Sequence, residues 1–156
     1  MDVHVVGTCC GCVPRTCRGR CTALLSYLRM TLAALYIVLF GGYFDAIILD
    51  QVPLPIPLLR LLTTSHIVYY CHHPDLLLCT ERASFLKWIY RMVIDTLEEY
   101  TTGFAHKIFV NSKYTQDVFY DTFPLLKKKP TEVLYPAVDL EQFRSFSPDP
   151  SALPEL

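Results

Sequence analysis

Four short apolar segments, each separated from the next by a helix-like stretch, constrain the fold of this chain more than any other feature. The segments span residues 44–50, 67–71, 107–110 and 131–135. Strands that alternate with helices in this way join through right-handed crossovers and pair in parallel. The continuous apolar run in 44–50 is typical of a strand that is buried on both faces. The sequence therefore predicts an α/β fold with a sheet of about four parallel strands.

The segments between the predicted strands carry helix patterns. Residues 58–62 form a short apolar helix, and residues 113–123 follow Ser112, which is well placed to cap a helix. Between residues 80 and 100, apolar residues recur three and four positions apart, which predicts a long amphipathic helix. Its apolar face comprises Phe85, Leu86, Ile89, Met92, Val93, Thr96, Leu97 and Tyr100, and its charged face Lys87, Arg91, Asp95, Glu98 and Glu99.

A more hydrophobic segment precedes the first predicted strand. Residues 22–42 contain one charged residue, Arg29, and end in Gly41-Gly42, which acts as a helix stop. About 20 apolar residues are enough to span a bilayer, and the three arginines within residues 15–20 resemble the basic flank of a membrane anchor. Because Arg29 is costly at bilayer depth, a span, a helix on the membrane surface and a helix packed on the sheet all stay open.

Composition and cysteine spacing narrow the class of protein. The net charge of −1 provides no global field that would favour binding to nucleic acid. Five of the seven cysteines lie within residues 1–21, and an odd, clustered set does not form a disulfide framework, so reduced thiols are expected. The N-terminal stretch is interpreted as an irregular lead-in. Zinc ligation by Cys9, Cys12, Cys17 and Cys21 is the alternative, although their spacing is unlike that of zinc sites.

Polar residues gather where three of the predicted strands end. A proline stops strand pairing, and parallel strands bring their carboxyl ends, where α/β proteins bind ligands, to one edge of the sheet. Each residue also has a structural alternative, such as capping a turn or a helix. We expect these strand ends to form a site from Asp50, His72, His73, Asp75, Asn111 and Ser112.

Other kinds of site fit the sequence less well. Adjacent histidines such as His72 and His73 point apart, and no third ligand motif follows them, so no metal site is expected there. No glycine-rich phosphate loop follows a predicted strand, and there is no Gly-x-Ser-x-Gly elbow. The Lys127-Lys128-Lys129 run predicts a solvated loop, with contact to anionic lipid as the alternative.

Several motifs occur in order along the chain and carry a family resemblance. They are Asp50-Gln51, Tyr70–Leu78, Glu98–Gly103, Val110–Thr115 and Leu134–Asp139. With these motifs the chain resembles the retaining glycosyltransferases of family 4 over about residues 22–143. The Val-Asn-Ser and Tyr-Pro-x-Val-Asp elements are shared across that family. The Cys-His-x-Pro-Asp-Leu-Leu-Leu and Glu-Glu-Tyr-Thr-Thr-Gly elements resemble those of its mannosyltransferases in asparagine-linked glycosylation.

The resemblance implies a GT-B enzyme, in which two Rossmann-like domains face each other. It assigns residues 43–138 to an incomplete N-terminal, acceptor-side domain and residues 139–156 to a linker or a truncated end. It also implies that the family's first strand and glycine-rich loop precede residue 1, and that the donor domain follows residue 156. The chain alone is therefore expected to be inactive.

The resemblance further implies the reaction and its setting. Mannose would be transferred from GDP-mannose, with retention and without a metal or other cofactor, to a dolichol-diphosphate-linked oligosaccharide, through α-1,3 and α-1,6 additions. The expected place is the cytosolic face of the endoplasmic reticulum membrane, with other mannosyltransferases of the same pathway as further partners. His72 matches the family's His-x-Pro position, which implies that it is the catalytic residue, with its imidazole near the transferred sugar and forming hydrogen bonds as charge develops. The other residues of the expected site would then bind substrate. The alternative is a non-catalytic, membrane-associated α/β module or a truncated product that binds only acceptor lipid or partner proteins.

Overall fold

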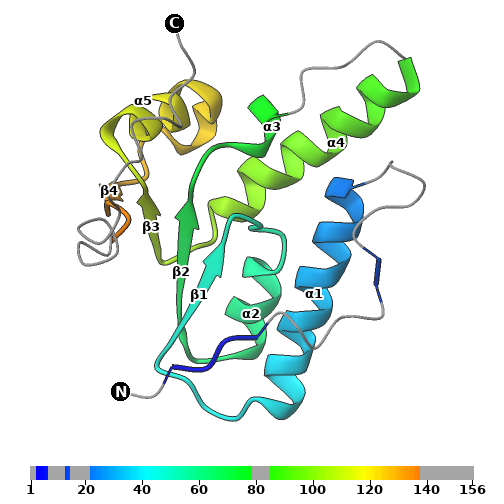
Figure 1. The fold of residues 1–156 in the computed structure, drawn as a ribbon, viewed down its shortest axis with the longest axis vertical. Coiled ribbons are helices and arrows are strands. Elements are labelled where there is room, and N and C mark those ends of the chain that lie inside the picture. The colour runs from blue at the N-terminus through cyan, green and yellow to red at the C-terminus, as the bar shows by residue number, and fades with distance from the viewer. Residues whose placement is uncertain (1–2, 7–12, 15–21, 79–84, 138–156) are drawn as a thin grey trace, which may run out of the picture.

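The computed structural model describes residues 3–6, 13–14, 22–78 and 85–137 of the chain (Figure 1). The N-terminal cysteines, with their zinc alternative, and the tail expected over residues 139–156 lie outside this part. The elements are α1 (Thr22–Phe40), β1 (Ala46–Asp50), α2 (Ile56–Leu62), β2 (His66–Cys71), α3 (Asp75–Leu78), α4 (Phe85–Thr102), β3 (Lys107–Val110), α5 (Lys113–Thr122), the 3-10 helix η2 (Pro124–Leu126) and β4 (Thr131–Val133).

The four strands form one parallel sheet in the order β1-β2-β3-β4, as the sequence predicts. In its register, Asp50 lies beside Tyr70, and Cys71 lies beside Val110. The carboxyl ends of all four strands therefore lie at one edge. An α/β architecture with a parallel sheet, interleaved helices and an apolar N-terminal helix is thus confirmed.

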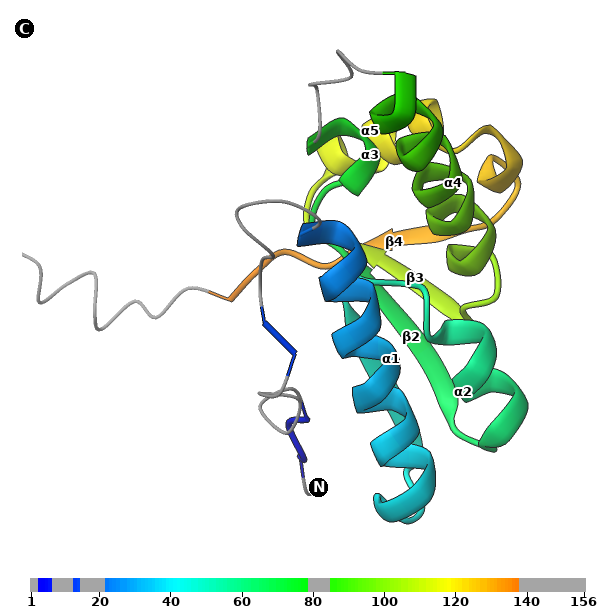
Figure 2. The same cartoon turned by 90° about the vertical axis from the view of Figure 1, so that its right-hand side faces the viewer.

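The core lies between one face of this sheet and the helices. Figure 2 shows α2 and α4 on the same side of the sheet, as right-handed crossovers between strands in chain order require. Ile67, Tyr69 and Ile108 point to that side and are 0% exposed. Burying each such side chain contributes about 1.5–3 kcal/mol to folding. These residues belong to a single hydrophobic cluster that also includes α5.

The opposite face of the sheet is open among the described residues, which corrects one expectation. Strand β1 is buried on one face only: Ile47 and Leu49 are inside, whereas Ile48 is 71% exposed. Val68 and Phe109, which share the open face with Ile48, are partly buried. A continuous apolar run cannot show whether both faces are covered, because the cover comes from other elements.

Helix α1 lies along the edge of the helical layer. Ala34 is part of the core, whereas Leu24 and Leu39 are 50% and 69% exposed. The helix ends at the predicted glycine pair, where the amide of Gly41 donates a hydrogen bond to the Ile37 carbonyl over 2.9 Å. By length and composition, α1 is able to cross a membrane, a test that core helices and N-terminal signal sequences also pass.

Helix α4 is amphipathic, as predicted, but it buries its charged face. Arg91 and Glu98 are 3% and 1% exposed, and Asp95 is also buried. In contrast, Met92 and Val93 are 46% and 50% exposed. Helices of soluble domains usually show the reverse arrangement, with the apolar stripe toward the core.

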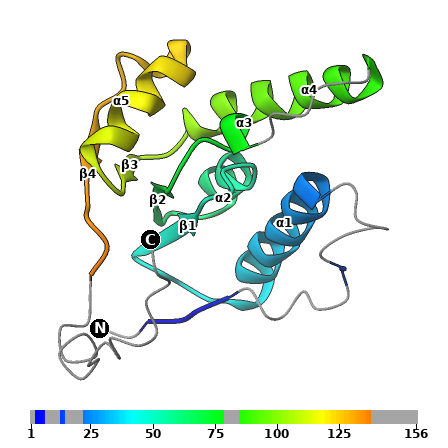
Figure 3. The same cartoon turned by 45° about the horizontal axis from the view of Figure 1, so that its top comes forward.

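The first residue of α3 explains why the charged face of α4 is buried. Helix α3 begins at Asp75, directly after Pro74, and lies against α4 (Figure 3). The guanidinium of Arg91 donates to the Asp75 carboxylate over 3.3 Å and to the Asp75 carbonyl over 3.1 Å, and it also pairs with Asp95 over 2.7 Å. The backbone N–H of Asp75 donates to Glu98 Oε1 over 2.7 Å. Only a polar helix face provides partners of both signs for Asp75.

The end of α4 is fixed by polar contacts as well. Leu125 N donates to Glu99 Oε1 over 2.7 Å, which ties η2 to the helix. The Lys129 ammonium donates to the carbonyls of Gly103 and Ala105, so it caps the carboxyl end of α4. Burial, followed by repulsion from a nearby arginine, lowers the pKa of Lys129. The solvated loop that the lysine run predicts therefore describes its first two lysines, which are exposed, but not Lys129.

Substitutions at two consecutive positions of α4 test its reversed orientation. Arg91→Met should lower the free energy of unfolding by about 3–5 kcal/mol, because buried carboxylates lose their cation. Met92→Gln, on the exposed side, should change the free energy of unfolding by less than about 0.5 kcal/mol. Urea unfolding followed by circular dichroism measures both values. A small loss for Arg91→Met together with a large one for Met92→Gln would contradict the observed orientation.

Candidate functional site

An imidazole and a carboxylate meet at the carboxyl edge of the sheet. Asp50 is the last residue of β1, and His72 is the first residue after β2. Because the strands are neighbours in register, the two side chains approach until His72 Nε2 and Asp50 Oδ1 are 2.9 Å apart. The structure thus brings together two residues that are 22 positions apart in the sequence, and both belong to the expected site.

The pair is accessible to solvent and is oriented by a tyrosine. The His72 and Asp50 side chains are 49% and 70% exposed, and exposed pairs of this kind contribute only about 0–1 kcal/mol to stability. The rings of His72 and Tyr70 meet edge to face, with their centroids 4.8 Å apart and their planes at 84°. The Tyr70 hydroxyl donates to the Leu134 carbonyl over 2.9 Å, which fixes its ring. The arrangement orients an imidazole rather than stabilising the fold.

A glutamine also holds the backbone beside this pair. The side chain of Gln51 accepts a hydrogen bond from His72 N through Oε1 over 3.0 Å and donates one to the His73 carbonyl through Nε2 over 2.6 Å. Among the described residues other than glycine, Gln51 is the one with a positive φ, of 64°. Sequence reasoning assigned it no role. The available signal was its position directly after Asp50 in a family-like motif.

Two of the expected substrate-binding residues, Asp75 and His73, form contacts that hold the backbone near the site. The Asp75 carboxylate binds Arg91 of α4 at 3.3 Å, so it anchors the beginning of α3. His73 takes part through its carbonyl, which accepts from Gln51. Neither of these contacts shows a role in substrate binding.

The residues after β3 form a helix cap. Ser112 Oγ accepts a hydrogen bond from Thr115 N over 3.1 Å, which confirms the predicted cap of α5. Ser112 also donates to Asn111 Oδ1 over 3.2 Å. The hydroxyl of Ser112 is therefore engaged in local structure, and Asn111 lies beside it at the same sheet edge.

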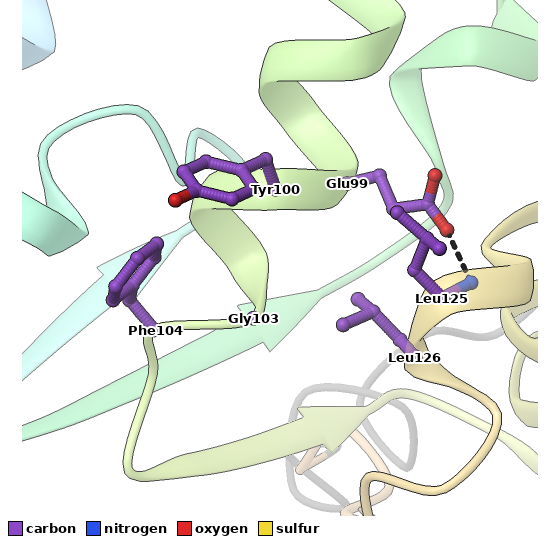
Figure 4. Close-up of a pocket in the computed structure, with 6 residues that line it drawn as sticks. All are labelled: Glu99, Tyr100, Gly103, Phe104, Leu125 and Leu126. Atoms are coloured by element: carbon purple, nitrogen blue, oxygen red, sulfur yellow. Dashed lines mark hydrogen bonds between the residues drawn. The ribbon is translucent and has the colours of Figure 1, made fainter.

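Two pockets lie along α4. One, of about 290 Å³, is lined by Glu99, Tyr100, Gly103, Phe104, Leu125 and Leu126 (Figure 4). Another, of about 270 Å³, lies between α4 and the end of α5. Neither is lined by Asp50 or His72. Within the described residues, no three His, Cys, Asp or Glu side chains are arranged to hold a metal ion.

Comparison with known proteins settles the family. The family model described as Glycosyltransferase Family 4 matches residues 4–142. The chain belongs to glycosyltransferase family 4. It is 44% identical to the alpha-1,3/1,6-mannosyltransferase ALG2 of Dictyostelium discoideum over 92% of its length, and 46% identical to the human protein of that name over 84%. It spans only 33% and 32% of these two relatives. No solved structure matches.

In this family 4 chain, the motifs that carry the resemblance serve two purposes. Asp50-Gln51 and His72 lie together at the carboxyl edge. The Glu98–Gly103 motif instead fixes neighbouring elements, because Glu98 holds the start of α3 and Glu99 holds η2. A side chain added at Gly103 would approach the Tyr100 carbonyl within 3.1 Å. This motif therefore contributes to the framework around the site.

The thiol next to His72 is not a nucleophile. Cys71 is 0% exposed, and burial, followed by the nearby Glu98 carboxylate, raises the pKa of its thiol to about 12. Because only the thiolate attacks electrophiles, Cys71 stays protonated and unreactive near neutral pH.

Alkylation with iodoacetamide at pH 8 tests this conclusion. Cys71 in the folded chain should react at least about a hundredfold more slowly than in urea, where its pKa returns to that of a free thiol. Mass spectrometry of the peptide that contains Cys71 distinguishes it from the other six cysteines. Equal rates in the folded and unfolded chain would show that the thiol is accessible.

Proposed function

We propose that this chain forms part of the acceptor-side domain of a retaining mannosyltransferase. The full enzyme would transfer mannose from GDP-mannose to a dolichol-diphosphate-linked oligosaccharide through α-1,3 and α-1,6 additions. The identity to alpha-1,3/1,6-mannosyltransferases supports the reaction. The single observation that supports the location of the chemistry is the 2.9 Å contact between His72 and Asp50 at the carboxyl edge.

The chemistry of the pair suits glycosyl transfer. Positive charge develops on the sugar ring in the transition state, and hydroxyl groups near that ring are best held by an oriented hydrogen-bonding group. Asp50 engages Nε2 of His72, which directs Nδ1 toward a sugar hydroxyl. Asp50 therefore orients the ring, and His72 contacts the transferred sugar.

The other expected site residues divide into two groups in this proposal. His73 and Asn111 remain proposed substrate contacts, since they flank the pair along the carboxyl edge. Asp75 and Ser112 act through their contacts with Arg91 and Thr115, which hold the loops that carry the site. Residues that bind the nucleotide of the donor belong to the remainder of the enzyme, so the 156-residue chain alone is proposed to be inactive.

Two apolar surfaces support action at a membrane. One is the exposed side of α1, which includes Leu28 and Leu39. The other is the outer face of α4, where Trp88 and Tyr100 are 45% and 62% exposed. Aromatic side chains of this kind favour the boundary between lipid and water, where a dolichol-linked acceptor resides. We place the enzyme on the cytosolic face of the endoplasmic reticulum membrane, beside other mannosyltransferases of the same pathway.

A chimeric enzyme tests the role of His72. Residues 22–142 would replace the matching part of the human relative, and mannose transfer from GDP-mannose to the lipid-linked acceptor would be measured. His72→Ala should lower turnover by about a hundredfold or more, whereas His73→Ala should lower it much less. The isolated chain is the negative control. Equal losses for the two variants would argue against a special role for His72, and an inactive chimera would favour a non-catalytic binding module.

Vesicle binding tests the membrane surface. The chain should co-sediment with vesicles of phosphatidylcholine and phosphatidylserine. The double substitution Leu28→Glu, Leu39→Glu should weaken binding at least about tenfold, because it places charge on the exposed apolar surface that would contact the lipid. Tyr114→Glu is the matched control, since Tyr114 is 70% exposed but lies on α5. Unchanged binding of the double variant, or an equal loss for the control, would refute membrane contact through α1.

A further inference from the structure

We propose that Gln51 is a positioning residue for His72, so that its side-chain amide sets the direction in which the imidazole points. This role rests on the proposed function of His72. The amide makes two hydrogen bonds, of 3.0 Å from His72 N and 2.6 Å to the His73 carbonyl. A side-chain amide has both a donor and an acceptor. A carboxylate or an aliphatic group of similar size cannot make both bonds.

The backbone at Gln51 is adapted to this contact. Its φ of 64° lies in the left-handed region, which is unfavourable for a residue other than glycine. The conformation is held from both sides, because Gln51 N donates to the Tyr70 carbonyl over 3.0 Å and the Tyr69 hydroxyl donates to the Gln51 carbonyl over 3.0 Å. Backbone strain of this kind concentrates at functional sites. The turn at the end of β1 thus directs the side chain across to the segment after β2.

The end of β1 holds His72 at two points. Asp50 contacts the ring of His72 at Nε2, and the neighbouring Gln51 accepts a hydrogen bond from the backbone N–H of His72. Asp50 is 70% exposed, so its contact with the ring alone is weak. Fixing the backbone of His72 places its Cβ atom within reach of Asp50, so that Nε2 can meet the carboxylate. The pair at the candidate site therefore depends on Gln51.

The substitution Gln51→Gly separates positioning from stability. Glycine adopts a positive φ without strain, so the relief of strain offsets the loss of the two hydrogen bonds. The equilibrium constant for unfolding should change by less than about fivefold. Gln51→Glu keeps the length of the side chain but loses the donor to the His73 carbonyl. In both variants the imidazole of His72 should no longer be held in one orientation.

Nuclear magnetic resonance of the 156-residue chain reads the position of the ring without requiring activity. In the wild type, His72 should populate one χ1 rotamer and show contacts between its ring and that of Tyr70. In Gln51→Gly the rotamers should average and the ring contacts should weaken at least about threefold. Gln116→Ala is the matched control. It also removes a side-chain amide that donates to a carbonyl, that of Thr131 over 2.9 Å, but Gln116 lies on α5. A single His72 rotamer in Gln51→Gly, or a variant that unfolds, would overturn the proposal.

A double-mutant cycle in the chimeric enzyme provides a second measurement. Gln51→Gly should lower turnover at least about tenfold in the wild-type background and have little further effect after His72→Ala, because the two residues act as one unit. Equal losses in both backgrounds would show that Gln51 acts independently of His72 and would overturn the inference. If His72→Ala itself leaves turnover unchanged, the proposed function fails instead. The two failures are therefore distinguishable.

Discussion

A buried arginine determines how the helical layer lies on the sheet. Arg91 binds the carboxylate and the carbonyl of Asp75 and pairs with Asp95 inside the protein. Because charges removed from water must find partners, α4 has to present its polar side to α3. Its apolar side then faces outward, where Met92 and Val93 are about half exposed. One set of ionic contacts thus fixes the beginning of α3 and creates an apolar outer surface.

The segment that carries the candidate site is held at both of its ends. At its start, Gln51 binds the backbone of His72 and His73. At its other end, Glu98 and Arg91 bind Asp75. Between these anchors lies a proline, which restricts the backbone further. A short loop with this many constraints keeps a solvent-exposed imidazole in a defined place, as a site for transient sugar contacts requires.

The sequence predicts the parallel sheet because alternation of strands and helices leaves few topologies, and it predicts the meeting of Asp50 and His72 because carboxyl ends share an edge. It does not reveal which face of α4 is buried, since periodicity shows only that the two faces differ. The role of Gln51 depends on a positive φ and on partners 21 and 22 residues away. Likewise, Lys129 belongs to a lysine run that gives no sign of its partners, the carbonyls of Gly103 and Ala105 just after α4. These features arise from tertiary contacts that local patterns do not encode.

The open side of the sheet has a consequence for handling the chain. Strand β1 has one neighbour among the described strands, so half of its backbone groups point away from the sheet, and Ile48 next to them is 71% exposed. An unpaired edge beside an apolar face is a template on which other chains add strands. When produced by itself at high concentration, the polypeptide should self-associate through β1. A charged residue in place of Ile48 is then the most direct way to keep it monomeric in solution.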